Sequence, residues 1–278
     1  MIEGQTNVRS SRFGAGAIDG IGKELGRFVV TTMEVPWQRA QPRIGAPPAA
    51  GIRRGHRVEY VGQTSPDPLV IDYDLIRTAP AELNIAGVGD LLSIHTACFD
   101  WELASRAGRS EFPYRPEDVA AARAILADTM VKAKAIRDCS DDGLRAIVEG
   151  YMRVNTLCLP AGHYRVEEGS EHYLFYELEE RLQRPFIHGW IVGLGVHLLS
   201  RLQENRHAET VDFMGCVGLR YQPTDLGIGR DDLMSALLNL RHYVESRRDL
   251  WHTIIQERSI SPAWIQEALG TLKFNPDL

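Results

Sequence analysis

The chain has 278 residues, of which 44% are hydrophobic and 24% are charged, a composition that excludes a disordered or fibrous protein. The length is enough for one large domain or two ordinary domains, each with a sizeable core. The formal net charge is −6, so the chain has no excess of basic residues for binding a nucleic acid by bulk electrostatic attraction.

The cysteine pattern and the apolar segments indicate the compartment. The four cysteines form no CxxC pair and have no regular spacing, which argues against a disulfide framework or a thiolate zinc site. Residues 1–12 are polar and do not resemble a signal peptide. The longest apolar stretch, 187–199, contains two histidines and has the length of a buried helix rather than of a membrane span. We therefore expect a cytoplasmic protein with no membrane or nucleic-acid partner.

Short strands dominate the predictions for the first 77 residues. The Gly14-Ala15-Gly16 turn is followed by one readable helix, over residues 17–25. Residues 36–55 are rich in Pro, Gly, Ala and Arg, and this composition predicts a loop without an element of its own. Runs of β-branched and aromatic residues predict strands at 27–32, 57–61 and 68–72.

Helical periodicity dominates after residue 78. Pro116, Ser140 and Ser261 each precede or begin an apolar pattern in the way that helix N-termini do. The predicted fold class is therefore α/β plus all-α, with a shortened, Rossmann-like α/β part over 1–77 and an all-helical domain over 78–278. The predicted helices are 81–106, 116–137, 141–157, 170–183, 188–204, 230–256 and 261–272.

Asp90 lies on the apolar face of the predicted helix 81–106. The positions 4, 7, 8 and 11 residues after it are all apolar, and an ionised carboxylate on a buried helix face is costly unless it is paired or binds a metal. An equally weighted alternative is that Asp90 caps a helix that begins after Gly87-Val88-Gly89.

Two histidines are predicted near the starts of apolar helices. Ser170 is a natural N-cap, which places His172 in the first turn, and His188 precedes Gly189, where the missing side chain permits a close approach. Each histidine alone is more typical of a hydrogen-bonded core residue. Asp90, His172 and His188 together would form a three-ligand site with an open position, a set that suits Zn²⁺ or Fe²⁺.

Six segments distributed over most of the chain carry a family resemblance. Their sequences are FGAGAI (13–18), DLIRTAP (74–80), AGVGDLL (86–92), DWELA (100–104), GSEH (169–172) and HG (188–189). In residue type and spacing they resemble the iron-containing (group III) alcohol dehydrogenase superfamily, with its dehydroquinate synthase-like fold, and the glycerol-1-phosphate dehydrogenase branch in particular.

The resemblance implies a site and an activity. It implies that Asp90, His172 and His188 bind a catalytic Zn²⁺ or Fe²⁺, which polarises a substrate hydroxyl for hydride transfer to NAD or NADP. The implied function is oxidoreduction of a small polyol or phosphorylated polyol, with room for a homo-oligomer.

The chain also departs from the family. It has no Gly-Gly-Gly run for a pyrophosphate, only 77 residues precede the helical half, and Tyr176 replaces a frequent second histidine. One alternative is therefore a non-catalytic relative that kept the metal domain and lost dinucleotide binding. Another is a dehydroquinate synthase-like cyclase, which Asp rather than Glu at position 90 disfavours.

Overall fold

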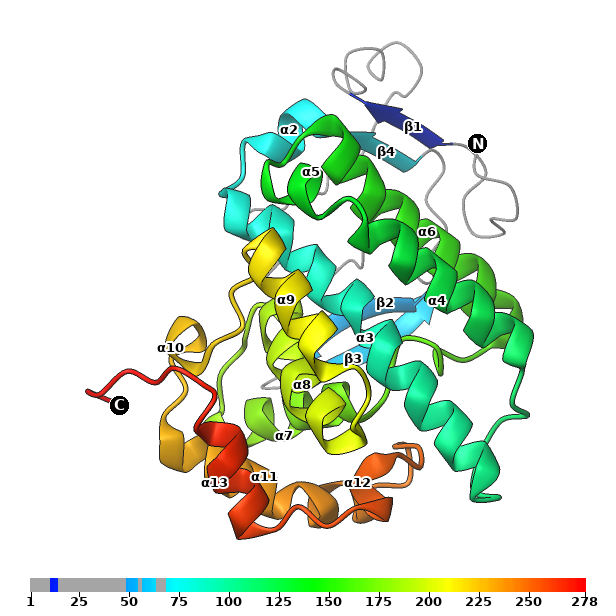
Figure 1. Ribbon diagram of the computed structural model, residues 1–278. Helices are drawn as coiled ribbons and strands as arrows, with labels where there is room; N and C mark the ends of the chain where they lie inside the picture. The colour runs from blue at the N-terminus through cyan, green and yellow to red at the C-terminus, as the bar shows by residue number, and fades with distance from the viewer. Residues whose placement is uncertain (1–10, 15–48, 55–56, 64–68) are drawn as a thin grey trace.

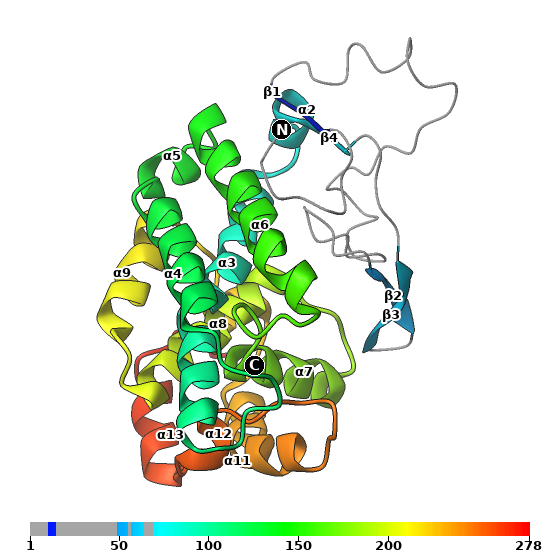
Figure 2. The ribbon, with the colours of Figure 1, turned by 90° about the vertical axis from the view of Figure 1, so that its right-hand side faces the viewer.

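The computed structural model describes residues 11–14, 49–54, 57–63 and 69–278, and the side chains from residue 71 onward. Strand β1 (Ser11–Gly14) pairs in parallel with β4 (Leu69–Asp72), with Phe13 opposite Ile71. Strand β2 (Ala49–Arg54) forms an antiparallel hairpin with β3 (Arg57–Gln63). Figure 2 shows this hairpin beside helix α7 (Ser170–Leu182), apart from the β1–β4 pair.

These strands test part of the N-terminal prediction. The strands expected at 57–61 and 68–72 are confirmed as β3 and β4. The prediction of a loop over 36–55 is wrong for residues 49–54, which form β2. The composition of this stretch does not suggest a strand, but its pairing with β3 supplies the backbone hydrogen bonds of one. The helix expected at 17–25 and the strand expected at 27–32 lie outside the described residues.

A largely helical body follows β4. Short α2 (Tyr73–Arg77) begins because the Asp72 carboxylate accepts the backbone N–H groups of Asp74 and Leu75, at 2.9 and 3.0 Å. The remaining helices are α3 (Ala81–Arg106), α4 (Pro116–Met130), α5 (Ala133–Arg137), α6 (Asp141–Ala161), α8 (His188–Gln203), α9 (His207–Val217), α10 (Pro223–Leu226), α11 (Arg230–Glu245), α12 (Ile254–Glu257) and α13 (Pro262–Leu269).

Two long predicted helices are each broken into two. The helix expected over 116–137 turns at Val131, which is 81% exposed, and this turn allows Ile136 of α5 to become buried. The helix expected over 230–256 ends at Glu245. Beyond it the N–H groups of Trp251 and Ile254 donate to Tyr173 and Asp100, so tertiary contacts replace the helical hydrogen bonds there.

Helix α3 is the centre of the body. It packs against α4, α6, α7 and α8, and Leu92, Ala97 and Trp101 are completely buried along it (Figures 1 and 2). Burial on several sides explains why α3 is apolar around most of its circumference. Within the described ranges, none of the helices combines the length and the apolar character that a membrane span requires.

Candidate metal centre

Helices α3 and α8 touch backbone to backbone at two glycines. A Cβ atom added to Gly89 would lie 1.8 Å from the carbonyl oxygen of Gly189, and one added to Gly189 would lie 1.6 Å from the carbonyl oxygen of Ala86. Neither position has room for any other residue type. The crossing brings Asp90 and His188, the sequence neighbours of the two glycines, to the same point.

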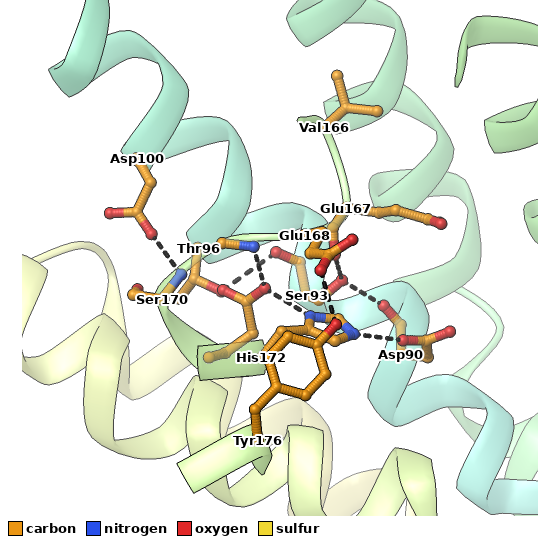
Figure 3. A network of polar contacts seen from close by, with 12 residues as sticks. Asp90, Ser93, Thr96, Asp100, Val166, Glu167, Glu168, Ser170, His172 and Tyr176 are labelled. Carbon is orange, nitrogen blue, oxygen red and sulfur yellow. Dashed lines mark hydrogen bonds and ion pairs between the residues drawn. The ribbon is translucent and has the colours of Figure 1, made fainter. Parts of the chain in front are cut away.

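Three potential ligand atoms converge at this crossing. The Oδ1 atom of Asp90 lies 2.9 Å from Nε2 of His188 and 3.3 Å from Nε2 of His172, and the two Nε2 atoms are 3.3 Å apart. Asp90 comes from the middle of α3, His172 from the first turn of α7 and His188 from the first position of α8. Figure 3 shows the His172 ring directed at Asp90. In the part of the chain that the structure describes, no other set of this kind was found.

The spacing of these atoms fits a divalent metal. Ligand atoms bound at 2.0–2.1 Å to a tetrahedral Zn²⁺ lie about 3.3 Å from one another. The His172 side chain is 1% exposed, that of Asp90 5%, and that of His188 12%, so solvent reaches the cluster from one side. Two imidazoles and one carboxylate are three protein ligands, which is the number found in catalytic zinc sites, where water or substrate takes the fourth position.

Glu171 holds His172 from behind. Its Oε1 atom accepts the Nδ1–H of His172 at 2.9 Å and the N–H of Gly169 at 2.7 Å, and its Oε2 atom accepts the hydroxyl of Thr96 at 2.6 Å. This arrangement fixes the tautomer that directs the Nε2 lone pair of His172 at the centre. Nδ1 of His188, by contrast, is buried without a hydrogen-bond partner among the described residues.

The electric field at the centre favours a cation. Burial lowers the pKa of His172, but the hydrogen bonds to Asp90 and Glu171 outweigh burial and raise the pKa to about 10. Burial also raises the pKa of Asp100 to about 6, with Coulombic repulsion from Glu171 adding to the shift. The carboxylates of Asp90, Asp100 and Glu171 thus create a negative potential around His172, and such a potential favours the binding of a metal cation.

The structure tests two predictions about helix starts near the centre. Asp90 is not a helix cap, because Gly87, Val88 and Gly89 lie inside α3. The prediction that Ser170 is the N-cap of the next helix is wrong: Ser170 is the first residue of α7, and Gly169 precedes it without a side-chain cap. His172 and His188 nevertheless occupy the predicted helix starts.

Glu171 and Thr96 were not predicted from the sequence. The only signal for Glu171 is its position beside His172, in a first helical turn where an acidic residue is common at exposed positions. Thr96 is six residues from Asp90 on α3, and the helix geometry places it near the centre only once the packing of α7 is known.

Curated proteins similar to this chain are glycerol-1-phosphate dehydrogenases of archaea, although no family model matches it. The NAD(P)+ enzyme of Methanosarcina acetivorans is 29% identical over 241 residues, covering 83% of this chain and 67% of that protein. The enzyme of Pyrococcus horikoshii is 29% identical, covering 70% and 55%, and that of Cenarchaeum symbiosum is 28% identical, covering 92% and 72%. The chain thus spans only part of the length of these relatives.

Solved structures share the fold. A probable glycerol dehydrogenase from Sinorhizobium meliloti aligns with a TM-score of 0.58 at 22% identity, covering 82% of this chain and 66% of that one. The glycerol dehydrogenase of Schizosaccharomyces pombe aligns with a TM-score of 0.56 at 20% identity, covering 86% and 60%. The predicted resemblance to glycerol-1-phosphate dehydrogenases is confirmed by the curated relatives. The fold is shared with the glycerol dehydrogenases and, with a TM-score of 0.55 at 11% identity, with an iron-containing alcohol dehydrogenase of Corynebacterium glutamicum.

Proposed function

We propose that the protein is a metal-dependent, NAD(P)-linked oxidoreductase that acts on a small polyol or polyol phosphate. The convergence of Asp90, His172 and His188 on one point carries this proposal. The names of the curated relatives, which specify both NAD(P)+ and glycerol 1-phosphate for those proteins, support the activity and the nicotinamide cofactor. They also disfavour the cyclase alternative.

The residues at the centre have distinct tasks in this proposal. Asp90, His172 and His188 would hold Zn²⁺ or Fe²⁺, and Glu171 keeps His172 in the required tautomer and orientation. When bound, the metal polarises the substrate hydroxyl and makes its carbon a better hydride donor to the nicotinamide. The buried network behind His172 keeps water away from that side, so the substrate approaches from the side of His188.

The proposal also assigns tasks to the two parts of the chain. Residues 78–278 would carry the metal, and the α/β part over 1–77 would contribute to nucleotide binding. The parallel pairing of β1 with β4 is the kind of strand arrangement that α/β nucleotide-binding units use. The four cysteines are free thiols, which fits the reducing cytoplasm expected for this protein.

The test uses the full chain, stripped of metal and reloaded with Zn²⁺ or Fe²⁺. Nicotinamide reduction is followed with glycerol 1-phosphate or glycerol and either NAD+ or NADP+. We expect metal-dependent turnover that Asp90→Asn abolishes and that Glu177→Gln retains, because Glu177 is a buried carboxylate of α7 paired with Arg181 instead of the centre. A wild-type protein that binds no metal, or an Asp90→Asn variant with full activity, would refute the proposal.

One observation favours a second candidate. The sequence contains no Gly-Gly-Gly run, so a relative that kept the metal centre and lost dinucleotide binding is the main competitor. A fluorescence titration with NADH and NADPH separates the two candidates. Saturable binding of either nucleotide supports the oxidoreductase, and metal binding without nucleotide binding supports the non-catalytic relative.

A further inference from the structure

Thr96 lies two hydrogen bonds behind the metal centre, on the same helix as Asp90. Its hydroxyl donates to Oε2 of Glu171 at 2.6 Å, and Oε1 of Glu171 accepts the Nδ1–H of His172 at 2.9 Å. In Figure 3, Thr96 and Asp90 lie on opposite sides of the His172 ring. A series of hydrogen bonds therefore runs from Thr96 through Glu171 to a proposed metal ligand.

The two carboxylate oxygens of Glu171 have different numbers of donors. Oε1 accepts two N–H groups, those of Gly169 at 2.7 Å and of His172, whereas Oε2 accepts only the hydroxyl of Thr96 among the described residues. Glu171 and Thr96 are both 0% exposed, so bulk water cannot replace this hydroxyl. A buried carboxylate oxygen without a donor is costly. Loss of the hydroxyl should therefore turn the carboxylate toward its other donors and weaken its hold on His172.

The backbone of Glu171 is packed too closely to move in compensation. A Cβ atom added to Gly195 of α8 would lie 2.5 Å from the carbonyl oxygen of Glu171, and one added to Gly169 would lie 2.9 Å from Cα of Ala97 in α3. The turn that carries Glu171 is thus pressed against two helices. With the backbone fixed, the donors around the carboxylate set its orientation, and the Thr96 hydroxyl is one of them.

We propose that Thr96 is a positioning residue, whose hydroxyl holds the Glu171 carboxylate on His172 and thereby sets the affinity of the centre for its metal. The inference rests on the proposed function, because it concerns the metal that this function requires. Thr96 acts only through Glu171 in this proposal. His188 has no comparable support, since its Nδ1 atom is buried without a partner among the described residues, so the effect of Thr96 passes through His172.

Zn²⁺ affinity of the full chain, measured by competition with a chromophoric chelator, tests this role. Thr96→Val removes the hydroxyl and keeps the shape of the side chain. It should weaken Zn²⁺ binding by about tenfold, the lower end of the range for outer-shell partners of a metal ligand. Thr96→Ser keeps a hydroxyl and should restore most of the affinity. Thr129→Val is the matched control, because Thr129 is 3% exposed and its hydroxyl donates to the carbonyl of Ile125 at 3.0 Å, within α4.

A double-mutant cycle separates a role through Glu171 from a general loss of packing. In a Glu171→Gln background, Thr96→Val should cause little further loss of Zn²⁺ affinity, because the carboxylate that the hydroxyl holds is already absent. Two substitutions that acted independently would instead multiply their effects on the dissociation constant.

The metal-free protein gives a measurement that does not depend on the oxidoreductase proposal. Isotope labelling of histidine lets NMR observe the proton on Nδ1 of His172, and the His172→Gln variant assigns its resonance by loss of the signal. Because this proton is buried and hydrogen-bonded to a carboxylate, we expect a downfield resonance that exchanges slowly with water. Thr96→Val should move the resonance upfield and speed its exchange, whereas Thr96→Ser and Thr129→Val should not.

Wild-type Zn²⁺ affinity in Thr96→Val would overturn the inference, as would an equal loss in Thr129→Val or an unchanged His172 resonance in Thr96→Val. A merely structural role for Thr96 predicts a lower unfolding temperature with the affinity and the resonance unchanged. Failure of the proposed function has a different signature. In that case the wild-type protein binds no Zn²⁺, while the metal-free resonance still decides whether Thr96 positions His172.

Discussion

The carboxylate of Glu171 is completely buried, and its hydrogen bonds hold the His172 ring in position. An unpaired carboxylate in such a place would be very costly, but three donors surround this one: the imidazole of His172, the hydroxyl of Thr96 and the N–H of Gly169. The network fixes the His172 ring before any metal arrives. It thereby lowers the entropy that metal binding would otherwise cost.

Glu171→Gln should weaken Zn²⁺ binding by about 10–100-fold without unfolding the protein, because the amide is a poorer acceptor for the His172 Nδ1–H than a carboxylate. Competition with a chromophoric chelator measures the affinity. Glu177→Gln changes another buried carboxylate on α7, paired with Arg181 and Asn239, and should keep the wild-type affinity. Equal affinities in all three proteins would show that Glu171 has no part in metal binding.

His197 is a buried histidine that the centre does not use. Its Nε2 atom lies 3.0 Å from the Thr271 hydroxyl, and burial, with further contributions from His207 and Arg201, lowers its pKa to about 3. An unfolded histidine binds its proton near pH 6.5. Protonation therefore favours the unfolded chain as the pH falls from 6.5 toward 3.

The wild-type protein should lose about 1.4 kcal/mol of unfolding free energy per pH unit through His197 alone in this window. His197→Asn keeps a polar side chain and removes the titration, so its stability should fall less steeply between pH 6.5 and pH 4.5. Urea unfolding of both proteins at several pH values gives the difference in slope, in which the other titrating groups cancel. Parallel curves would contradict the assignment.

The residue types of the centre were visible in the sequence, because a lone Asp on an apolar face and two His at helix starts are unusual. Its supporting network was not. Glu171, Thr96 and Ser93 acquire their roles only when α3, α7 and the segment before α7 meet, and nothing in their local sequence indicates that meeting. For Asp90 the sequence is compatible with both a ligand and a helix cap, and the continuity of α3 through Gly89 excludes the cap.

At the scale of the helices, the close crossing of α3 and α8 is what brings two of the proposed ligands together. Two helices approach this closely only where both lack side chains, and the two glycines lie directly beside the proposed ligands Asp90 and His188. A larger residue at either glycine would separate the helix axes. The ligand atoms would then move apart even though no ligand had been changed.

Gly89→Ala should destabilise the protein by about 2 kcal/mol or more, because the overlap with the Gly189 carbonyl outweighs the roughly 1 kcal/mol that alanine gains over glycine in a helix. Gly215→Ala in α9 meets nothing within 4 Å and should be neutral or stabilising. Chemical unfolding gives both values, and the Zn²⁺ affinity of Gly89→Ala should fall as well. A Gly89→Ala protein as stable as Gly215→Ala would mean that the helices do not touch here.

The elements that the sequence predicted well are those with strong periodicity and a clear cap. Ser140 and Ser261 accept backbone N–H groups at the starts of α6 and α13, as expected. Helix α9 was not predicted. The turn before it contains Glu204 and Arg206 in left-handed backbone conformations, and no glycine in the sequence marks that turn. The breaks in 116–137 and 230–256 have tertiary causes and leave little trace in local composition.

At the scale of the whole molecule, α3 joins the metal centre to the C-terminal helices. Asp90 lies on α3 at the centre, and Asp100, about ten residues farther along, accepts the N–H groups of Ser170 and Ile254 at 2.9 Å each. Helices α11, α12 and α13 gather at one end of the body, away from β1 and β4 (Figures 1 and 2). The centre therefore lies inside a core that is packed independently of any metal.

This placement predicts how the protein responds to metal removal. The apo protein should keep its helical circular dichroism, because the ligands come from α3, α7 and α8, whose packing buries a large apolar core. Zn²⁺ at about 100 times its Kd should stabilise the folded state by about 2.7 kcal/mol. For a chain of this size that gain corresponds to a rise in Tm of roughly 5–10 °C.

Asp90→Asn should show no such rise at the same Zn²⁺ concentration, while its apo form melts near the wild-type apo temperature because the amide still fits between the two imidazoles. Calorimetry with and without EDTA measures all four states. Loss of helical signal on chelation would mean that the metal is structural and folds the body, as in a zinc finger. An equal rise in Tm for Asp90→Asn would place the bound zinc elsewhere in the chain and remove Asp90 from the centre.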